Sequence, residues 1–331
     1  MTIFVWIGFL ALVLIFLALD LGVFHRKAHV IEIREALTWS VIWVAAALLF
    51  NVGIYFMYEH RLFHIGDHFG RPCDLDGLTA AGKFFTVYVV EKSLSLDNIF
   101  VISLIFAYFG VPAIYQHRVL FWGILGAIVL RGVMIGLGAT ILHYATWMIY
   151  VFGLVLIVTA IKMLISKHEA VCPDRDPIVR LVKKFFPVTK EYHGERFCVR
   201  IDGKLFLTPL FLALLVVESA DVVFAVDSIP AAFGITTDPF LVFTANIFAI
   251  LGLRSLYFAL AAMIRKFRYL KISLVVILLY VGVKMLCFEV IEHYKVENKM
   301  TWISLSVIML VMLIGVIASL WTNQREMKNE K

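Results

Sequence analysis

The chain has 331 residues, of which 62% are hydrophobic and 16% charged, whereas soluble globular proteins carry about 25% charged residues. This composition excludes an ordinary soluble domain and predicts an all-α membrane protein that crosses the bilayer several times. The net charge of +6 fits an excess of Lys and Arg in cytoplasmic loops, so no nucleic-acid partner is expected.

Several apolar runs are long enough to cross a bilayer, which takes about 20 residues of helix. They cover residues 3–24, 37–58, 83–107, 119–142, 146–166, 205–232, 240–264, 271–290 and 301–321. The sequence therefore predicts about nine transmembrane helices in a single polytopic membrane domain over residues 1–331.

Basic residues follow every second span, among them Arg26, Arg118, Lys167, Arg265 and Arg325. With nine spans, all of these residues fall on one side of the membrane, and the side rich in Lys and Arg is the cytoplasmic one. We therefore expect the N-terminus outside and the C-terminus in the cytoplasm.

One long cytoplasmic loop is predicted at residues 167–204, and it contains three prolines and charges of both signs. We expect a short amphipathic helix near 177–186. A hairpin is predicted near 196–207, because apolar and polar residues alternate there around Asp202-Gly203. The loop is interpreted as a connector between two halves of the domain.

The two halves resemble each other, at about 81–166 and about 205–290. Three matches occur in the same order: Val89-Val90-Glu91 with Val216-Val217-Glu218, Leu130-Arg131 with Leu253-Arg254, and Lys162-Met163-Leu164 with Lys284-Met285-Leu286. Each unit has three helices, an odd number, so the second unit is expected to be inverted relative to the first. Inverted repeats build many transporters, and their binding sites lie near the bilayer midplane.

Five acids lie within two of the predicted spans: Glu91, Asp97, Glu218, Asp221 and Asp227. A charge in the bilayer core costs about 3 kcal/mol on insertion scales, so such residues usually face a protected interior and mark an ion path. Carboxylate and amide oxygens suit hard cations such as Mg²⁺, Ca²⁺ and Mn²⁺. The acids are the candidate metal ligands, with Asn98 and Asn246 as second choices.

Helical spacing does not bring all five acids together. Glu91, Ser95 and Asn98 share one face of an ideal helix, and Asp97 points away from it. In the second segment Asp227 is displaced around the helix from Glu218 and Asp221. Two explanations stay open: a helix is locally unwound, for which Pro230 is the best signal, or some acids pair with Arg131 or Arg254.

A structural network of buried salt bridges is the main alternative to an ion site. Five cations lie within the predicted spans, as many as the acids: Lys92, Arg131, Lys162, Arg254 and Lys284. They are candidates for supporting ion pairs. Enzymatic function is not expected, because the sequence contains no Gly-rich phosphate loop and no H-E-x-x-H helix, and no organic cofactor is implied. The four cysteines form no metal or redox motif.

Three long segments resemble the signatures of the TerC family, and within it the bacterial Alx branch. They are residues 91–98, 218–231 and 246–258, and the resemblance extends from about 10 to 320. It implies a multi-pass protein of the bacterial inner membrane, related to the LysE transporter superfamily. The family was named for tellurite resistance and several members are linked to manganese export. On this resemblance the five acids are carried over as Mn²⁺ ligands.

The leading hypothesis is an exporter of divalent metal cations, most of all Mn²⁺, with release of the ion by proton exchange. A second hypothesis, which plant relatives of the family favour, is an assembly or insertion factor for membrane proteins with a structural acid–base network. The sequence leaves open the metal, the direction and coupling of transport, and the oligomeric state.

Overall fold

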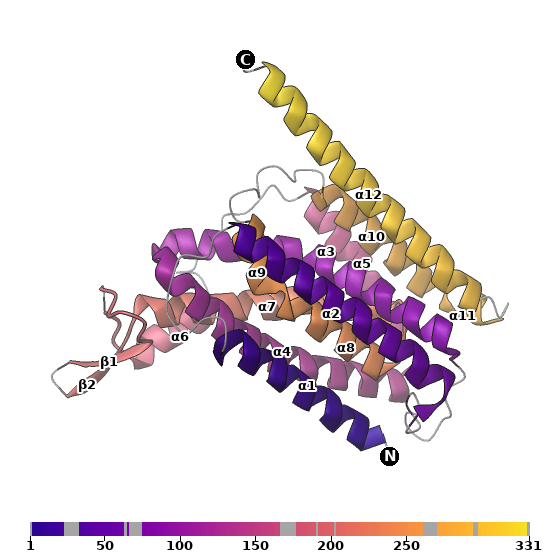
Figure 1. Cartoon of the computed structure of the whole chain (residues 1–331), viewed down its shortest axis with the longest axis horizontal. Helices are drawn as coiled ribbons and strands as arrows, with labels where there is room; N and C mark the ends of the chain where they lie inside the picture. The colour runs from indigo at the N-terminus through magenta and orange to yellow at the C-terminus, as the bar shows by residue number, and fades with distance from the viewer. Residues whose placement is uncertain are drawn as a thin grey trace.

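The computed structural model describes residues 2–22, 33–62, 65, 75–165, 177–189, 191–201, 203–260, 270–293 and 297–329. These residues form a bundle of helices with a small hairpin at one end (Figure 1). Three of the basic residues that predict the orientation, Arg26, Lys167 and Arg265, lie outside the described residues.

Within the described residues, a helix lies at each of the predicted span positions. These are α1 (Thr2–Gly22), α2 (Ile33–Glu59), α3 (Gly77–Phe109), α4 (Ala113–Tyr144), α5 (Met148–Ile165), α7 (Pro209–Phe233), the pair α8 (Pro239–Leu251) and α9 (Leu253–Leu260), α10 (Leu270–Leu286) and α12 (Glu297–Asn329). A short helix, α11 (Phe288–His293), precedes α12. The prediction of a mainly helical fold is confirmed.

Five of the described helices are long and apolar enough to cross a membrane, namely α2, α4, α5, α7 and the part of α12 from Lys299 to Ser319. A sixth span results if α8 and α9 count as one. Outward residues such as Val41 and Leu49 are 67% and 74% exposed, which fits a lipid-facing surface. Membrane-spanning helices are therefore confirmed, whereas the number nine and the inverted repeat stay predictions.

The two acid-bearing helices are continuous. Helix α3 runs from its cap at Asp76 to Gly110, whose φ of 64° ends it, and α7 runs unbroken from Pro209 to Phe233. The prediction of local unwinding near Pro230 is wrong. Pro230 lies in the last turn of α7, where its missing N–H removes one hydrogen bond and little helix remains to be redirected.

The break occurs instead in the seventh predicted span, between α8 and α9. The two helices meet at Gly252 with a bend of 41°. Asp238 begins α8 by accepting hydrogen bonds from the backbone of Phe240 and Leu241, and it also accepts one from the Tyr58 hydroxyl at 2.7 Å. A capped start and a broken end make α8 a short, well-anchored helix in the bundle core.

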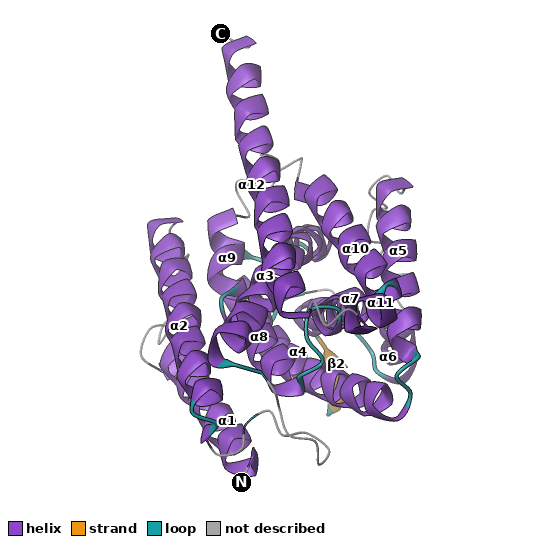
Figure 2. Cartoon of the chain, turned by 90° about the vertical axis from the view of Figure 1, so that its right-hand side faces the viewer, coloured by secondary structure: helices purple, strands orange, loops and turns teal. Residues whose placement is uncertain are grey.

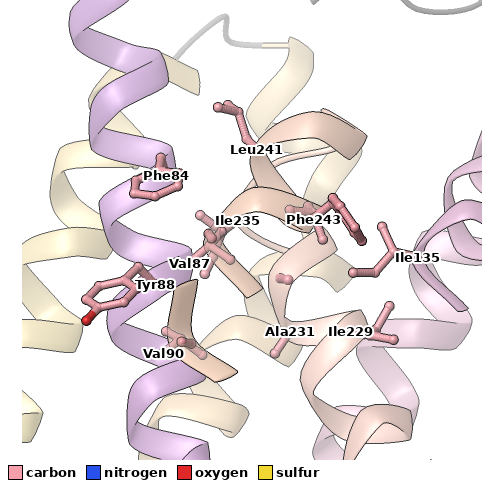
Figure 3. Packing of buried hydrophobic residues seen from close by; sticks show 14 of the residues in the cluster. Phe84, Val87, Tyr88, Val90, Ile135, Ile229, Ala231, Ile235, Leu241 and Phe243 are labelled. Carbon is pink, nitrogen blue, oxygen red and sulfur yellow. The ribbon is translucent and has the colours of Figure 1, made fainter. Parts of the chain in front are cut away.

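Helix α8 is buried on all sides and forms the centre of the larger hydrophobic cluster. Figure 3 shows Val87 of α3 beside Ile235, and Ile135 of α4 beside Phe243 of α8. Helices α3 and α4 thus hold α8 between them, and α7 packs against both. Helix α12 covers α3 and α10, and its C-terminal part extends beyond the other helices in both views (Figure 1; Figure 2).

Helices α5 and α10 approach each other at two glycines. A Cβ at Gly153 would lie 2.9 Å from the carbonyl oxygen of Gly282, and a Cβ at Gly282 would lie 2.9 Å from the carbonyl oxygen of Gly153. Small residues allow such backbone contact between membrane helices. This pair closes the bundle on the side opposite α2.

The segment between α5 and α7 contains the predicted elements, α6 (Pro177–Phe185) and a hairpin of β1 (Cys198–Ile201) and β2 (Lys204–Leu207). Both predictions are confirmed. Side chains fasten this segment to the end of the bundle: Tyr192 donates to the carbonyl of Phe109 at 2.7 Å, and Arg118 pairs with Glu195 at 2.9 Å. It therefore covers the end of α3 and the start of α4 (Figure 1).

Candidate functional site

Arg131 of α4 is the centre of the candidate site, and only 2% of its side chain is exposed. Its Nη2 and Nε donate to the two carboxylate oxygens of Asp221 on α7, at 3.0 and 3.2 Å. Its Nη1 donates to Glu91 Oε2 on α3 at 2.9 Å. One guanidinium therefore joins acids from both predicted repeat units.

Two neutral side chains complete the surroundings of Arg131. Nη1 also lies 2.9 Å from Asn246 Oδ1 on α8 and 3.3 Å from Ser228 Oγ on α7. Four helices thus meet at one buried cation. Because removal of one partner from a buried ion pair leaves an uncompensated charge, such a change typically costs about 3–5 kcal/mol.

Several buried polar atoms near Arg131 have no hydrogen-bond partner among the described atoms. They are Glu91 Oε1, Asn98 Oδ1, Asn246 Nδ2 and Glu218 Oε2. Buried polar atoms are nearly always hydrogen-bonded, so an unpartnered group calls for an explanation such as a bound ion or water. Glu91 Oε1 and Asn98 Oδ1, both on α3, matter most for an ion site, because both residues line a large cavity.

A cavity of about 520 Å³ opens between α3, α5, α7 and α10. Three of the five predicted acids line it, Glu91, Asp97 and Asp227. Its other polar walls are Ser95, Asn98, Arg131, Thr159, Lys162, Ser228 and Lys271, and its remaining walls are apolar. The cavity therefore presents oxygen ligands and fixed positive charges in one space.

The place of Asp97 differs from the prediction. Helical spacing predicts that it points away from Glu91, Ser95 and Asn98, yet all four residues line the same cavity. The cavity wall follows α3 from Glu91 to Leu104 and takes in more than half of the helix circumference, so a residue at the edge of the predicted face still reaches it.

Asp227 lies at a different wall of the cavity from Glu91. Its Oδ1 accepts a hydrogen bond of 2.8 Å from Thr159 on α5, and Lys162, one turn further on α5, lines the same cavity. Spacing along α7 contains no information about α5, so the sequence does not predict a neighbour for Asp227 on that helix.

Glu218 does not line either cavity of this region. Its carboxylate lies over Gly126 of α4, in the space that the Cβ of any other residue at position 126 would occupy. The prediction that Glu218 joins the other acids is therefore not met in this conformation. Its neighbour one turn on, Asp221, faces Arg131 instead, so acids on adjacent turns of α7 have different partners.

Arg131 also lines a second, much smaller cavity. Its volume is about 30 Å³, and Ser95, Asn98, Arg131 and Asp221 supply its polar walls. A water molecule needs at least about 10–15 Å³ of such space, so this cavity is large enough for one water or one small ion. Ser95, Asn98 and Arg131 line both cavities, so the two spaces are neighbours.

The other predicted cations have varied surroundings. Lys92 donates to the backbone carbonyl of Ala249 at 3.3 Å and lies over Gly252, and among the described residues it forms no ion pair. The amine thus binds the end of α8, and an ion pair of Lys92 stays a prediction. Arg254 is buried in α9, and Lys284 is half-buried in the last turn of α10.

No three acids, histidines or cysteines of the described residues lie close enough together to hold a metal ion. The physical reason is that Arg131 separates Glu91 from Asp221, while Asp227 and Glu218 face other helices. Sequence reasoning missed Ser228, Thr159 and Lys271. The available signal for Ser228 was its place directly after Asp227. For Thr159 it was its place three residues before Lys162, on the same helix.

Comparison with known proteins identifies the family. The family model described as "Integral membrane protein TerC family" matches residues 76–327. The chain belongs to the TerC family. An uncharacterized membrane protein of Myxococcus xanthus is 46% identical over 315 residues, which cover 95% of this chain and 91% of that protein.

Two further relatives carry the name membrane-bound redox modulator Alx. The protein from Photorhabdus laumondii is 42% identical over 324 residues, covering 96% of this chain and 95% of its own length. The protein from Escherichia coli K12 is 41% identical over 325 residues, covering 98% and 96%. No solved structure matches this TerC protein.

Proposed function

We propose that this TerC protein is a transporter of the bacterial inner membrane that exports a divalent metal cation, most of all Mn²⁺. The observation that carries the proposal is the cavity of about 520 Å³ between α3, α5, α7 and α10, which three of the predicted acids line. Ionisable side chains within membrane segments usually mark an ion pathway, because placing them there is costly.

The polar lining of the cavity suits a hard cation. Glu91, Asp97 and Asp227 supply carboxylates, and Asn98 and Ser95 supply neutral oxygens. Neither His nor Cys is among the lining residues. Carboxylate, carbonyl and water ligands favour Mg²⁺, Ca²⁺ and Mn²⁺ over softer metals, and the choice of Mn²⁺ among these rests on the family resemblance.

The acids lie at separate walls of the cavity, so a cation would enter as a partly hydrated ion. Mg²⁺ and ions of similar hardness commonly keep several waters and bind through one or two carboxylates. A cavity of this size holds an ion with part of its water shell, which supports entry without a preformed cage of three acids.

The packing supports two related units that move against each other. Helix α3 packs on α8, its proposed counterpart α7 packs on α4, and the proposed counterparts α5 and α10 pack on one another. A two-fold axis between an α3–α5 unit and an α7–α10 unit exchanges α3 with α7, α4 with α8 and α5 with α10. It therefore produces these helix contacts. Rocking of one unit against the other around a site between them is the usual basis of alternating access.

Release of the ion to the outside is proposed to occur in exchange for protons, which neutralise the carboxylates once the metal has left. The N-terminus is proposed to lie outside and the C-terminus in the cytoplasm. Basic residues of α6 and the hairpin, such as Lys183, Lys184 and Arg200, support this orientation, because their segment covers one end of the bundle.

The test is Mn²⁺ uptake into inside-out vesicles that contain the purified protein. Asp97→Asn and Asp227→Asn each remove one cavity carboxylate at nearly constant volume, and we expect either to reduce uptake at least about tenfold, as the loss of one charged ligand worth roughly 1.4 kcal/mol or more would do. Glu289→Gln is the matched control, since Glu289 is exposed on α11 and outside the cavity.

If the wild-type vesicles take up no Mn²⁺, or if Asp97→Asn and Asp227→Asn transport at the wild-type rate, the proposal is wrong. Metal analysis of the purified protein for Mn, Ca, Mg and Zn, with and without Asp97→Asn, decides which cation is bound.

A second candidate function is an assembly factor for membrane proteins, with the acids serving a structural network. The ion pairs of Arg131 with Glu91 and Asp221 favour it, because they neutralise two of the five acids without any metal. It predicts crosslinks from the α6–hairpin segment to nascent membrane proteins. It also predicts that Asp97→Asn leaves the amount of bound metal unchanged.

A further inference from the structure

Arg131 is held by the kind of oxygen ligands that a hard cation takes. Glu91, Asp221, Ser228 and Asn246 direct five side-chain oxygens at one guanidinium, at distances of 2.9 to 3.3 Å. The guanidinium also contributes to the wall of the large cavity. A fixed cation thus lies between Glu91 of α3 and Asp221 of α7.

The two acids are held unequally. Asp221 receives two hydrogen bonds, from Nη2 and Nε, in the forked geometry that is strongest for Arg and a carboxylate. From Arg131, Glu91 receives one bond, from Nη1, and this nitrogen is shared with Asn246 and Ser228. Glu91 is therefore the partner that Arg131 releases at lower cost.

Of the two acids, Glu91 is also the one with a carboxylate oxygen that could still bind a cation. Among the described atoms its Oε1 has no hydrogen-bond partner, and its side chain is 1% exposed. Glu91 lines the large cavity, and Asp221 does not. A cation that enters the cavity therefore meets Glu91 through a free oxygen while Arg131 still holds the other oxygen.

We propose that Arg131 is a tethered counter-cation that competes with the transported divalent cation for Glu91. With the cavity empty, Arg131 neutralises both acids. When the metal binds Glu91, Arg131 withdraws from it and stays on Asp221. This inference rests on the proposed transport function and names the group that regulates its site.

Competition between Arg131 and the metal for Glu91 lowers the apparent affinity of the site for the metal, which helps release. The apparent affinity of a ligand falls by the fraction of the protein that is in the binding-competent state, here the state in which Arg131 has left Glu91. Transport requires binding that is strong enough for entry and weak enough for release. Arg131 returns to Glu91 as the ion leaves, so no bare pair of acids remains in the bundle.

The test is Mn²⁺ binding to the purified full-length protein, measured by calorimetry. The double variant Arg131→Gln/Asp221→Asn removes one cation and one anion together and leaves Glu91 without a competitor. We expect it to bind Mn²⁺ about tenfold or more tightly than the wild type, since the competing state is lost. Arg131→Lys, which has a single ammonium and cannot form the fork on Asp221, should give a smaller increase.

The single variant Asp221→Asn separates this role from a purely structural one. With Asp221 neutral, Glu91 is the remaining carboxylate partner of Arg131, so Mn²⁺ binding should weaken although Asp221 lies outside the large cavity. A purely structural role does not predict that Arg131→Gln/Asp221→Asn raises the Mn²⁺ affinity while Asp221→Asn lowers it. Arg118→Gln is the control, because it breaks another Arg–carboxylate pair of α4, with Glu195, at the end of the bundle.

The outcomes separate the inference from the function on which it rests. A wild-type protein that binds no Mn²⁺ overturns both. If the wild type binds Mn²⁺ but the double variant binds no more tightly, or if Asp221→Asn binds as tightly as the wild type, the tethered counter-cation is wrong and the transport proposal stands. Should the double variant fail to fold, Arg131→Lys and Asp221→Asn decide in the same way.

Discussion

The five acids of the candidate site differ in their neighbours, and the neighbours decide what each acid can do. Glu91 and Asp221 share one guanidinium, Asp227 accepts a hydrogen bond from Thr159, and Glu218 lies over a glycine. A carboxylate with a fixed cation can exchange that cation for another. A carboxylate whose buried oxygen lacks a partner depends on its exact packing to stay where it is.

Gly126 decides the position of Glu218. Its missing Cβ leaves the space that the Glu218 carboxylate fills, so Gly126→Ala forces that side chain out of its place. Because the carboxylate is the end of a flexible side chain and can move aside, the cost should be below the roughly 1–3 kcal/mol of overpacking in a rigid core. We expect the midpoint of thermal unfolding in detergent to fall for Gly126→Ala.

The double variant Gly126→Ala/Glu218→Ala tests whether this collision is the cause. Removal of the carboxylate relieves the clash, so the double variant should be less destabilised than the sum of the two single variants. Strictly additive losses would show that Gly126 acts through something other than Glu218.

Asp76, before the first turn of α3, provides a pH-dependent contribution to stability. Partial burial raises its pKa, but hydrogen bonds from the side chain and backbone of Thr79 outweigh this and hold the pKa below its ordinary value of 3.8. The stabilisation is therefore present above about pH 4 and is lost as the pH falls through the lowered pKa.

At neutral pH we expect Asp76→Ala to cost about 1 kcal/mol, as the loss of a helix N-cap does. The difference in unfolding midpoint between Asp76→Ala and the wild type should shrink below pH 4. Asp76→Asn keeps an acceptor without a charge, so its difference from Asp76→Ala should not depend on pH. A wild-type advantage that persists unchanged at pH 3 would contradict this account.

At the scale of elements, the contact between α5 and α10 depends on two glycines whose backbones touch. A Cβ at Gly153 meets the carbonyl of Gly282, a backbone atom that cannot turn aside. Gly153→Ala should therefore separate the helices and lower the unfolding midpoint by an amount equivalent to about 1–3 kcal/mol. Because α5 carries Thr159 and Lys162, Mn²⁺ uptake should fall as well.

Gly136→Ala is the matched control for this prediction. Gly136 also lies inside a long helix, α4, but a Cβ there meets nothing within 4 Å. Replacing a helical Gly by Ala without strain stabilises by up to about 1 kcal/mol. If Gly153→Ala and Gly136→Ala change the unfolding midpoint alike, the glycine contact does not matter.

The sequence predicts where helices occur better than where they break. Long apolar runs locate the helices, and the turn at Asp202-Gly203 locates the hairpin, because both signals are local. Pro230 indicated a break that does not occur, while the bend at Gly252 had no sequence signal of its own. The fit of Lys92 and Trp43 against Gly252 arises only from tertiary packing.

The same limit applies to the site. The choice of acids and of Arg131 follows from charges within apolar runs, and Arg131 is one of the two arginines proposed as partners. Which acid it holds depends on how α4 and α7 cross, and helical spacing within one segment contains no such information. Thr159 on α5 was missed for that reason.

At the scale of the whole molecule, the bent pair α8–α9 affects how many times the chain crosses the membrane. Cys198 in the hairpin and Cys287 at the end of α10 are both exposed and unpaired, and α7, the bent pair α8–α9 and α10 lie between them. If the bent pair is one span and α10 also crosses the membrane, three crossings separate the two thiols, and they face opposite sides of the membrane. If the pair enters and leaves on one side, both thiols face the same side.

Single-cysteine variants, in which the other three cysteines are replaced by Ser, decide between these arrangements with a membrane-impermeant maleimide. We expect Cys198 to react only in inside-out vesicles and Cys287 only in right-side-out vesicles, because the basic α6–hairpin segment should be cytoplasmic. Reaction of both thiols from one side would make α8–α9 re-entrant and would remove the odd number of spans per unit on which the inverted repeat depends. The two units would then run in parallel, and rocking about a midplane site would lose its structural basis.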